Sequence, residues 1–170
     1  MFEQYSDRAR RVVFLSRKVA GRRGAAEIGV EDLMESLVVE DQGDFAKVLS
    51  QEWAASAALQ WRGTHQPFFS GETAAAIHSE LEPMLAPKGE ALADSADMPL
   101  TDGSKAVLEG AQKLSEELRP DSTASAHIEP LHLLAAALAE ESSEVARILK
   151  QAGVSREAVI AAIRSGNSAE

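Results

Sequence analysis

The sequence predicts an all-α fold built from two copies of one helical repeat. Apolar residues recur with helical spacing along most of the 170-residue chain. Alanine and leucine are frequent, whereas aromatic residues make up only 5% of the chain, which favours closely packed helices. The same order of helical segments also occurs twice, about 100 residues apart. We therefore expect one globular domain made of two related halves.

The first element of each repeat is a long helix that follows a hydroxyl residue. Ser6 precedes a helical pattern that continues to Arg23, and Thr101 precedes one that continues to Leu118. A hydroxyl at this place accepts a hydrogen bond from an otherwise unpaired amide of the first turn. We expect both residues to cap their helices.

The second and third elements of the two repeats also correspond. Residues 28–37 and 128–138 predict a second helix, in which Pro130 suits the first turn. Residues 45–51 and 145–151 match most closely and predict a third helix in each repeat. The isoleucines and the third segments are both 100 residues apart, and this agreement in order and spacing indicates a duplication.

The remaining segments complete the organisation of the chain. Residues 53–61 predict a helix that closes repeat one, and residues 155–164 predict a final helix after Gly153. Between the repeats we expect a loop, an additional helix and a linker, at residues 63–70, 72–85 and 86–99. The expected boundaries are 1–62 for repeat one, 63–98 for the insert and linker, 99–166 for repeat two and 167–170 for a tail.

Charge and composition restrict the classes of partner. The net charge is −10, although the first 24 residues carry seven basic and two acidic side chains. An acidic body argues against nucleic acid as the partner. The chain has no cysteine, no apolar run of about 20 residues and no apolar signal segment near its start. We expect a soluble cytoplasmic protein without membrane or nucleic-acid partners.

The duplicated segments resemble the Clp N-terminal domain, the twin-repeat module of ClpA-, ClpB- and ClpC-type unfoldases. The resemblance rests on residues 1–13, on Ile28 to Glu31 and on Ile128 to Leu134, and it covers residues 2–60 and 98–165. It implies eight helices in two pseudo-twofold-related groups of four, here with an added helix between the repeats. It also implies a module that binds substrates or adaptors, or that docks on components of the Clp ring.

The chain lacks the motifs of an enzyme. The phosphate-binding pattern Gly-x-x-x-x-Gly-Lys-Ser/Thr is absent, so the chain is not expected to act as an ATP-driven unfoldase itself. Nucleophilic catalysis has no cysteine and no Gly-x-Ser-x-Gly elbow to support it. We expect no catalytic site and no cofactor.

Some Clp N-terminal domains bind phosphorylated arginine, which needs a carboxylate for the guanidinium and a hydroxyl or helix amides for the phosphate. The resemblance implies that Ser6 and Glu31 fill these roles in repeat one. In repeat two Thr101 is present, but Leu131 stands at the Glu position, so that site is expected to be lost. The alternative is that Ser6 and Thr101 are only helix caps, and that Glu31 is only a favourable first-turn charge.

The four histidines do not form a zinc motif. His127 and His132 lack the i, i+4 spacing of helical ligands, and we expect a packed or hydrogen-bonded role for His132. His65 and His78 lie in the insert without other ligands nearby. No metal site is predicted.

An aromatic cluster at the end of repeat one offers a second candidate site. Four of the chain's eight aromatic residues lie within 17 positions: Trp53, Trp61, Phe68 and Phe69. If exposed, they form a surface for a partner protein. If buried, they close the open end of repeat one, and this is the interpretation we favour because the two tryptophans share a similar helix face.

Two functions from different classes follow from these features. The first is a protein-interaction module of the Clp chaperone and protease system. The alternative is a small-ligand or signal-sensing helical domain that has only the fold in common with Clp N-terminal domains. A ligand sensor needs a closed apolar pocket, whereas a docking domain needs an open surface.

Overall fold

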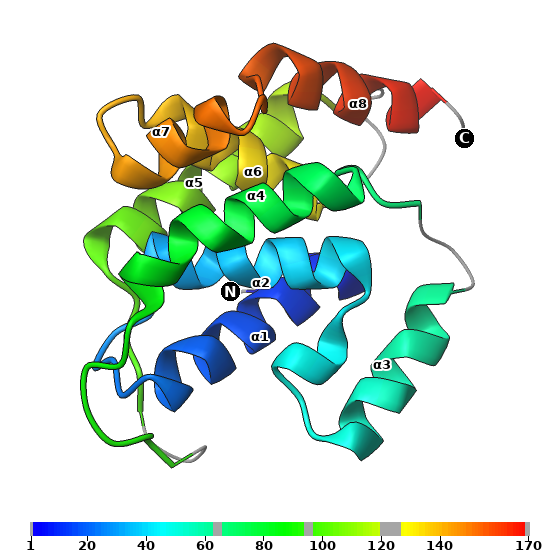
Figure 1. The fold of residues 1–170 in the computed structure, drawn as a ribbon. Helices are drawn as coiled ribbons and strands as arrows, with labels where there is room; N and C mark the ends of the chain where they lie inside the picture. Colours follow the sequence, from blue (N-terminus) through cyan, green and yellow to red (C-terminus); the bar gives the residue numbers. More distant parts are fainter. Residues whose placement is uncertain (1, 63–65, 94–96, 120–126, 169–170) are drawn as a thin grey trace.

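The computed structural model describes residues 2–62, 66–93, 97–119 and 127–168, and it confirms the all-α fold. Figure 1 shows how the helices are arranged. The α-helices and the two short 3-10 turns of the described residues are α1 (Asp7–Arg22), α2 (Val30–Gln42), η1 (Phe45–Lys47), α3 (Gln51–Arg62), α4 (Gly71–Leu81), η2 (Glu82–Leu85), α5 (Asp102–Glu117), α6 (Pro130–Ala139), α7 (Glu144–Gln151) and α8 (Arg156–Ser168).

The expected helix caps are present. The Ser6 hydroxyl accepts a hydrogen bond from the Ala9 amide at 3.1 Å, and the Thr101 hydroxyl accepts one from the Ser104 amide at 3.1 Å. Pro130 lies in the first turn of α6, where its missing N–H is not needed. Gly153 follows α7 with a φ of +90°, a conformation that suits glycine and that ends the helix as expected.

The two central helices, α2 and α6, are surrounded by the rest of the protein. Ten consecutive residues of α2, from Asp32 to Asp41, are buried, as are most residues of α6. A helix that is buried on all sides forms the middle of a bundle. In each half the first helix packs on the central one, so that α1 contacts α2 and α5 contacts α6. Figure 1 shows α2 and α6 in the middle of the molecule.

The fourth position of each half is filled by α4 and α8. Helix α4 packs on α2, and α8 packs on α6. The helix that the sequence places in the insert, at residues 72–85, is therefore part of the core as α4 and η2. Its side chains Ile77 and Leu81 are fully buried. By packing, α4 is the counterpart of α8, and α3 is the helix without a counterpart in the second half.

The third segment of repeat one differs from the expected helix at residues 45–51. Only a 3-10 turn forms there, and α3 begins at Gln51, whereas α7 of repeat two is a regular helix. The residues that precede the two segments explain the difference. Ser143 caps α7 through its hydroxyl, but Gly43 has no side chain and ends α2 in a left-handed conformation with a φ of +71°.

Helix α3 stands apart from the main bundle, as Figure 1 shows at its lower right. It packs chiefly on η1 and has its own small hydrophobic core. The buried members of this second core come from α1, α2, η1 and α3, and they are Leu15, Val39, Phe45, Val48 and Ala54. Trp61 covers this core and lies against Gly43, where an added Cβ would come within 3.1 Å of the indole ring. The geometry explains why residue 43 is a glycine.

The two halves are joined by reciprocal backbone contacts. Tyr5 forms a β-bridge with Ile128, and Ile28 forms one with Leu100. The segment before the first helix of each half therefore pairs with the segment before the second helix of the other half. The two bridges are equivalent to each other under the pseudo-twofold axis that relates the repeats.

Candidate functional site

The first junction between the repeats brings Ser6 to the start of α6. The Ser6 amide donates a hydrogen bond to the Ile128 carbonyl at 3.0 Å, and the Ile128 amide donates one to Gln4 at 2.8 Å. The Ser6 hydroxyl donates to the Glu129 carboxylate, with 2.9 Å between Oγ and Oε2. A hydroxyl and a carboxylate therefore meet here, but they come from opposite repeats.

Glu129 is a partly buried carboxylate at this junction. Burial raises the pKa of Glu129 because it removes water from the charged form, while the Ser6 hydroxyl and the charge of Arg8 act in the opposite direction. The Glu129 amide donates a hydrogen bond to His132 Nδ1 at 2.9 Å. Burial lowers the pKa of His132, so the ring is held neutral, as the accepting Nδ1 requires. The expected hydrogen-bonded role of His132 is confirmed.

The second junction brings Thr101 to the start of α2. The Thr101 amide donates to the Ile28 carbonyl at 3.0 Å, and the Ile28 amide donates to Pro99 at 2.9 Å. The Ser104 hydroxyl also donates to the Ile28 carbonyl at 2.8 Å. The Thr101 hydroxyl itself donates to Ser104 Oγ at 3.0 Å, so no carboxylate accepts it.

Glu31 belongs to an ion network at this second junction. Arg23 Nη2 donates to Glu31 Oε1 at 3.0 Å. The same guanidinium binds Asp32 in a bidentate manner, with 2.9 Å between Nε and Oδ1 and 2.9 Å between Nη2 and Oδ2. The side chains of Arg23 and Asp32 are 5% and 0% exposed, so this is a buried ion pair with Glu31 at its edge. Its carboxylates raise the pKa of Arg23, chiefly through the hydrogen bonds to Asp32.

The hydroxyl–carboxylate pair that the sequence suggested within repeat one has different partners in the structure. Ser6 is bonded to Glu129, and Glu31 is bonded to Arg23. Both residues do occupy junctions, but the exchange between the repeats sends them to opposite ones. The sequence contains no local signal for this exchange, because a duplicated chain offers each pairing segment twice.

The aromatic residues of repeat one are divided between the surface and the cores. Trp53 is 56% exposed, whereas Phe69 is 5% exposed and belongs to the main core. Phe68 packs edge-to-face on Phe69, with 5.2 Å between the ring centroids. The amides of both phenylalanines donate to the Asp41 carboxylate, which fixes this loop to α2. Together with Trp61 on the second core, three of the four aromatics are packed as expected, and Trp53 is the exception.

Trp53 has an aromatic partner from outside the aromatic cluster of residues 53–69. Phe14 on α1 is 40% exposed and stacks on the Trp53 ring, with 5.9 Å between centroids and an interplanar angle of 16°. The Lys18 ammonium lies 5.6 Å from the Phe14 centroid and 5.8 Å from that of Trp53. The available signal was that Phe14 falls outside the apolar stripe of its helix.

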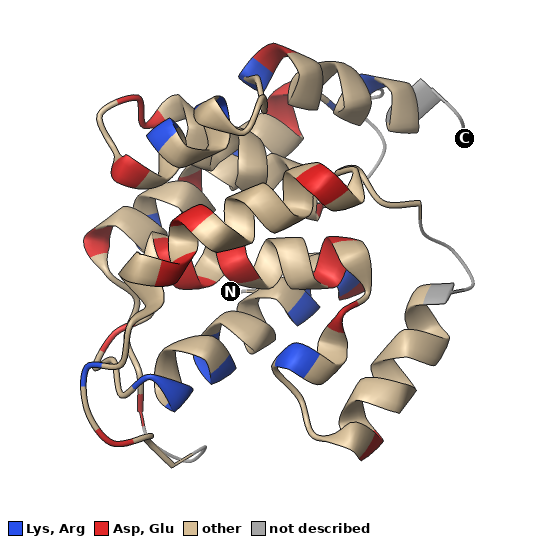
Figure 2. Cartoon of the chain, in the orientation of Figure 1, with Lys and Arg blue, Asp and Glu red and all other residues tan. Residues whose placement is uncertain are grey.

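A groove of about 380 Å³ runs between α1 and α3 at these rings. Leu49 and Ala57 contribute apolar walls, and Arg11, Glu52 and Gln60 contribute polar ones. Arg11 is held by Glu40 and Gln60, at 3.3 Å and 3.0 Å. We call this feature the α1–α3 groove. Figure 2 shows basic residues on α1 and η1 and also on α7 and α8, with acidic residues spread over the molecule.

The described residues contain no cluster of three or more histidine, cysteine or acidic side chains that could hold a metal ion. His65 and part of the loop at 63–70 lie outside the described residues. No helix in the described part of the chain is long and apolar enough to cross a membrane.

The fold of the chain is similar to that of the Clp N-terminal domains. No protein-family model matches the sequence, and a search of the curated proteins finds no relative. Solved structures do match. The N-terminal domain of the chaperone ClpD from Arabidopsis thaliana is 22% identical, with a TM-score of 0.60 over 99% of this chain and 97% of that one.

Two further structures support the same fold. The Hsp104 N-terminal domain from Candida albicans is 13% identical, with a TM-score of 0.60 over 95% of this chain and 89% of that one. A structure from a study of a malarial protein secretion system is 14% identical, with a TM-score of 0.66 over 97% of this chain and 95% of that one. The chain therefore has the Clp N-terminal domain fold along nearly its whole length.

Proposed function

We propose that this protein is a protein-binding module of the Clp chaperone and protease system, which captures substrates or adaptors in the α1–α3 groove. The observation that carries the proposal is the exposed stack of Phe14 on Trp53. Aromatic residues that remain exposed beside a groove are typical binding hot spots. The fold supports a module of the Clp type, since domains with this architecture are parts of the chaperones ClpD and Hsp104.

The chemistry of the groove indicates the partner. Aromatic and aliphatic side chains line the groove together with Glu52 and with Arg11, which is paired with Glu40. The Lys18 ammonium of α1 lies over the two aromatic rings beside it. A matching ligand is an extended or helical segment with a large apolar side chain between acidic residues. The apolar side chain would contact Phe14 and Trp53, and the carboxylates would face the basic side of α1.

Fluorescence anisotropy with labelled peptides tests this proposal. We expect a peptide with a leucine or phenylalanine anchor between aspartates to bind, and the same peptide with lysines in place of the aspartates to bind at least 10-fold more weakly. Trp53→Ser and Phe14→Ser should each reduce the affinity by about 10-fold or more. Leu59→Ser is the matched control, because Leu59 is 73% exposed on the same helix but does not line the groove. Equal affinity in all three variants would exclude the groove.

Recognition of arginine-phosphorylated substrates is a second candidate function, favoured by the contact between Ser6 and Glu129. This junction supplies the two groups that such a ligand needs, a carboxylate for the guanidinium and a hydroxyl for the phosphate. Thr101 lacks a carboxylate partner at the other junction, so the candidate is a single site.

Calorimetric titration with free phosphoarginine tests this second candidate. Binding of one equivalent that is abolished by Glu129→Gln, and that persists in Glu31→Gln, would support the Ser6–Glu129 junction. Binding that depends on Glu31 instead would assign the ligand to the other junction. The absence of heat at millimolar ligand would reject phosphoarginine recognition and leave the α1–α3 groove as the site to pursue.

A further inference from the structure

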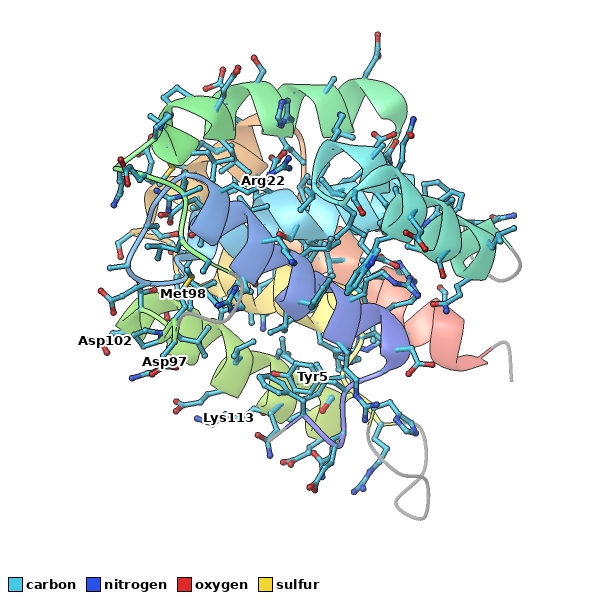
Figure 3. All side chains as sticks on the ribbon, turned by 90° about the horizontal axis from the view of Figure 1, so that it is seen from below. Tyr5, Arg22, Asp97, Met98, Asp102 and Lys113 are labelled. Atoms are coloured by element: carbon cyan, nitrogen blue, oxygen red, sulfur yellow. The ribbon has the colours of Figure 1, made fainter. Side chains whose placement is uncertain are left out.

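A second pocket, of about 520 Å³, lies between the C-terminal end of α1, η1 and the segment that follows α4. Its walls include Val19, Val48, Leu85 and Pro87, which form an apolar surface. It shares no residue with the α1–α3 groove. Figure 3 shows Arg22, one of its lining residues, between α1 and α4.

Two deeply buried polar side chains also line this pocket, and each has one unused atom. Among the described residues, Arg23 Nη1 and Glu35 Oε2 have no hydrogen-bond partner. The side chains of Arg23 and Glu35 are only 5% and 8% exposed. The other atoms of both groups are used, since Arg23 binds the carboxylates of the second junction and Glu35 Oε1 lies 2.6 Å from His78 Nδ1.

Unpartnered buried groups of this kind are unfavourable, because they have lost contact with water without gaining a hydrogen bond. Here one is a donor and the other an acceptor; both residues line the same pocket, and neither of the two atoms is exposed to solvent. Burial raises the pKa of Glu35, with the charge of His78 acting against this effect. A ligand that offers an acceptor to Arg23 and a cationic donor to Glu35 would satisfy both groups.

The rim of the pocket adds positive charge. Arg22 Nη1 donates to the carbonyls of Lys47 and Val48, at 2.9 Å and 3.1 Å, and so holds η1 beside α1. The Lys47 side chain is 55% exposed, and its Nζ lies 3.5 Å from Asp44. The rim therefore favours an anionic group on a ligand whose amine reaches Glu35.

We propose that this pocket binds a free apolar α-amino acid, whose amine contacts Glu35, whose carboxylate contacts Arg23 and Lys47, and whose side chain lies on Val19 and Leu85. The volume exceeds that of a single branched or aromatic amino acid, and small shifts of the side chains at the pocket wall would bring the two covered atoms into contact with the ligand. The site is separate from the α1–α3 groove and does not depend on the function proposed for that groove.

Calorimetry and thermal shift with L-phenylalanine and L-leucine test the proposal. We expect saturable binding of at least one of them, and at least 10-fold weaker binding of its N-acetyl and its carboxamide derivatives, because each derivative lacks one of the two charged groups. The proposal would be overturned if neither amino acid binds at concentrations up to about 20 mM. Equal binding of both capped derivatives would overturn the zwitterionic recognition.

Variants locate the site. Glu35→Gln should weaken binding by about 10-fold or more, and Lys47→Met by about 2- to 5-fold because Lys47 is on the surface. Lys47→Met keeps the test decisive if Glu35→Gln does not fold. Glu109→Gln and Lys105→Met are matched controls, since both residues are exposed on α5. Trp53→Ser should leave amino-acid binding unchanged, which separates this test from that of the α1–α3 groove. Binding that survives Lys47→Met and Glu35→Gln would place the ligand elsewhere and reject the pocket.

Discussion

The two central helices, α2 and α6, hold equivalent places in the two halves but use opposite chemistry. Helix α2 buries four acidic side chains, and each has a specific partner from elsewhere in the chain. Asp32 binds Arg23, Glu35 binds His78, Glu40 binds Arg8 and Arg11, and Asp41 binds the amides of Phe68 and Phe69. Helix α6 buries only leucines, alanines and a proline, apart from His132.

The difference lies in what each helix must position. Buried charges tolerate few geometries, so α2 fixes the end of α1, the loop before α4 and α4 itself through directional bonds. Apolar packing sets only distance, and α6 uses small residues to bring α5 close. Helix α3, the α1–α3 groove and the second pocket all lie in the half that contains α2. The half that contains α6 has none of these three features.

The largest expected effect comes from breaking the buried ion pair of α2. Arg23→Met leaves the Asp32 carboxylate without its cation in a site that is 0% exposed. We expect a loss of about 3–5 kcal/mol in the free energy of unfolding, measured by urea denaturation. The double variant Arg23→Met/Asp32→His copies the neutral cap of His132 onto α2 and should recover much of this loss. A double variant as unstable as the single one would show that α2 needs the charge itself.

The packing of α6 is the next test. An added Cβ at Gly110 of α5 would lie 3.2 Å from the Cβ of Ala136, so α5 and α6 touch through small residues. Ala136→Leu should therefore reduce the free energy of unfolding by about 2–3 kcal/mol through overpacking. Ala139→Leu, at the exposed end of the same helix, should change it by less than about 0.5 kcal/mol. Similar effects at both positions would contradict close packing as the organising feature of α6.

The two junctions predict unequal effects of removing their helix caps. Thr101→Ala removes a cap and the hydrogen bond that the hydroxyl donates to Ser104 Oγ, with an expected loss of about 1 kcal/mol in the free energy of unfolding. Ser6→Ala removes a cap and a hydrogen bond to the Glu129 carboxylate, which is stronger than one to a hydroxyl, so we expect about 1–2 kcal/mol. Paired urea denaturation curves of the two variants measure the difference. A larger loss in Thr101→Ala would mean that the bond to Glu129 contributes nothing.

The smallest effect concerns the pH dependence of the cap on α6. Because burial lowers the pKa of His132 in the folded state, the unfolded chain takes up this proton more readily. The contribution of neutral His132 to the free energy of unfolding is therefore fully present above the unfolded pKa of about 6.5. It is lost as the pH falls below that value, by at most about 1.4 kcal/mol per pH unit.

The variant His132→Asn isolates this contribution. The Asn side-chain oxygen can accept the Glu129 amide without titrating. Denaturation at pH 7.5 and pH 5 should show that the wild-type advantage over the variant shrinks at the lower pH. A constant difference between the two proteins across this range would contradict a neutral, buried His132.

Much of the architecture could be predicted from local signals. The hydroxyl caps at Ser6 and Thr101, the stop at Gly153 and the start at Pro130 each act within a few residues of chain, and the structure contains all four. The apolar pattern of the third segment of repeat one matches that of α7 and therefore predicts a helix, but only a 3-10 turn forms there. The deciding residue was Gly43, which ends α2 where Ser143 begins a helix.

The candidate sites could be predicted only in part. Trp53 was identified as a member of an aromatic cluster, but its exposure depends on the position of α3, which stands off the bundle beside Phe14. Three other aromatics of the same cluster are packed, and no local pattern separates them from Trp53. The pairing of Ser6 with Glu129 joins residues 123 positions apart, and it depends on the exchange between the repeats.

The sequence by itself determined the all-α class, the duplication, the helix caps and the packed or hydrogen-bonded role of His132, because these features depend on periodicity and on contacts within one or two turns. The tertiary structure decided which helix fills the fourth place of repeat one, which carboxylate meets which hydroxyl, and which aromatic rings stay at the surface. Those outcomes depend on contacts between distant segments, and two similar repeats give a chain more than one locally satisfactory way to pair them. Packing of the whole bundle, with its buried charges matched, selects one of these pairings.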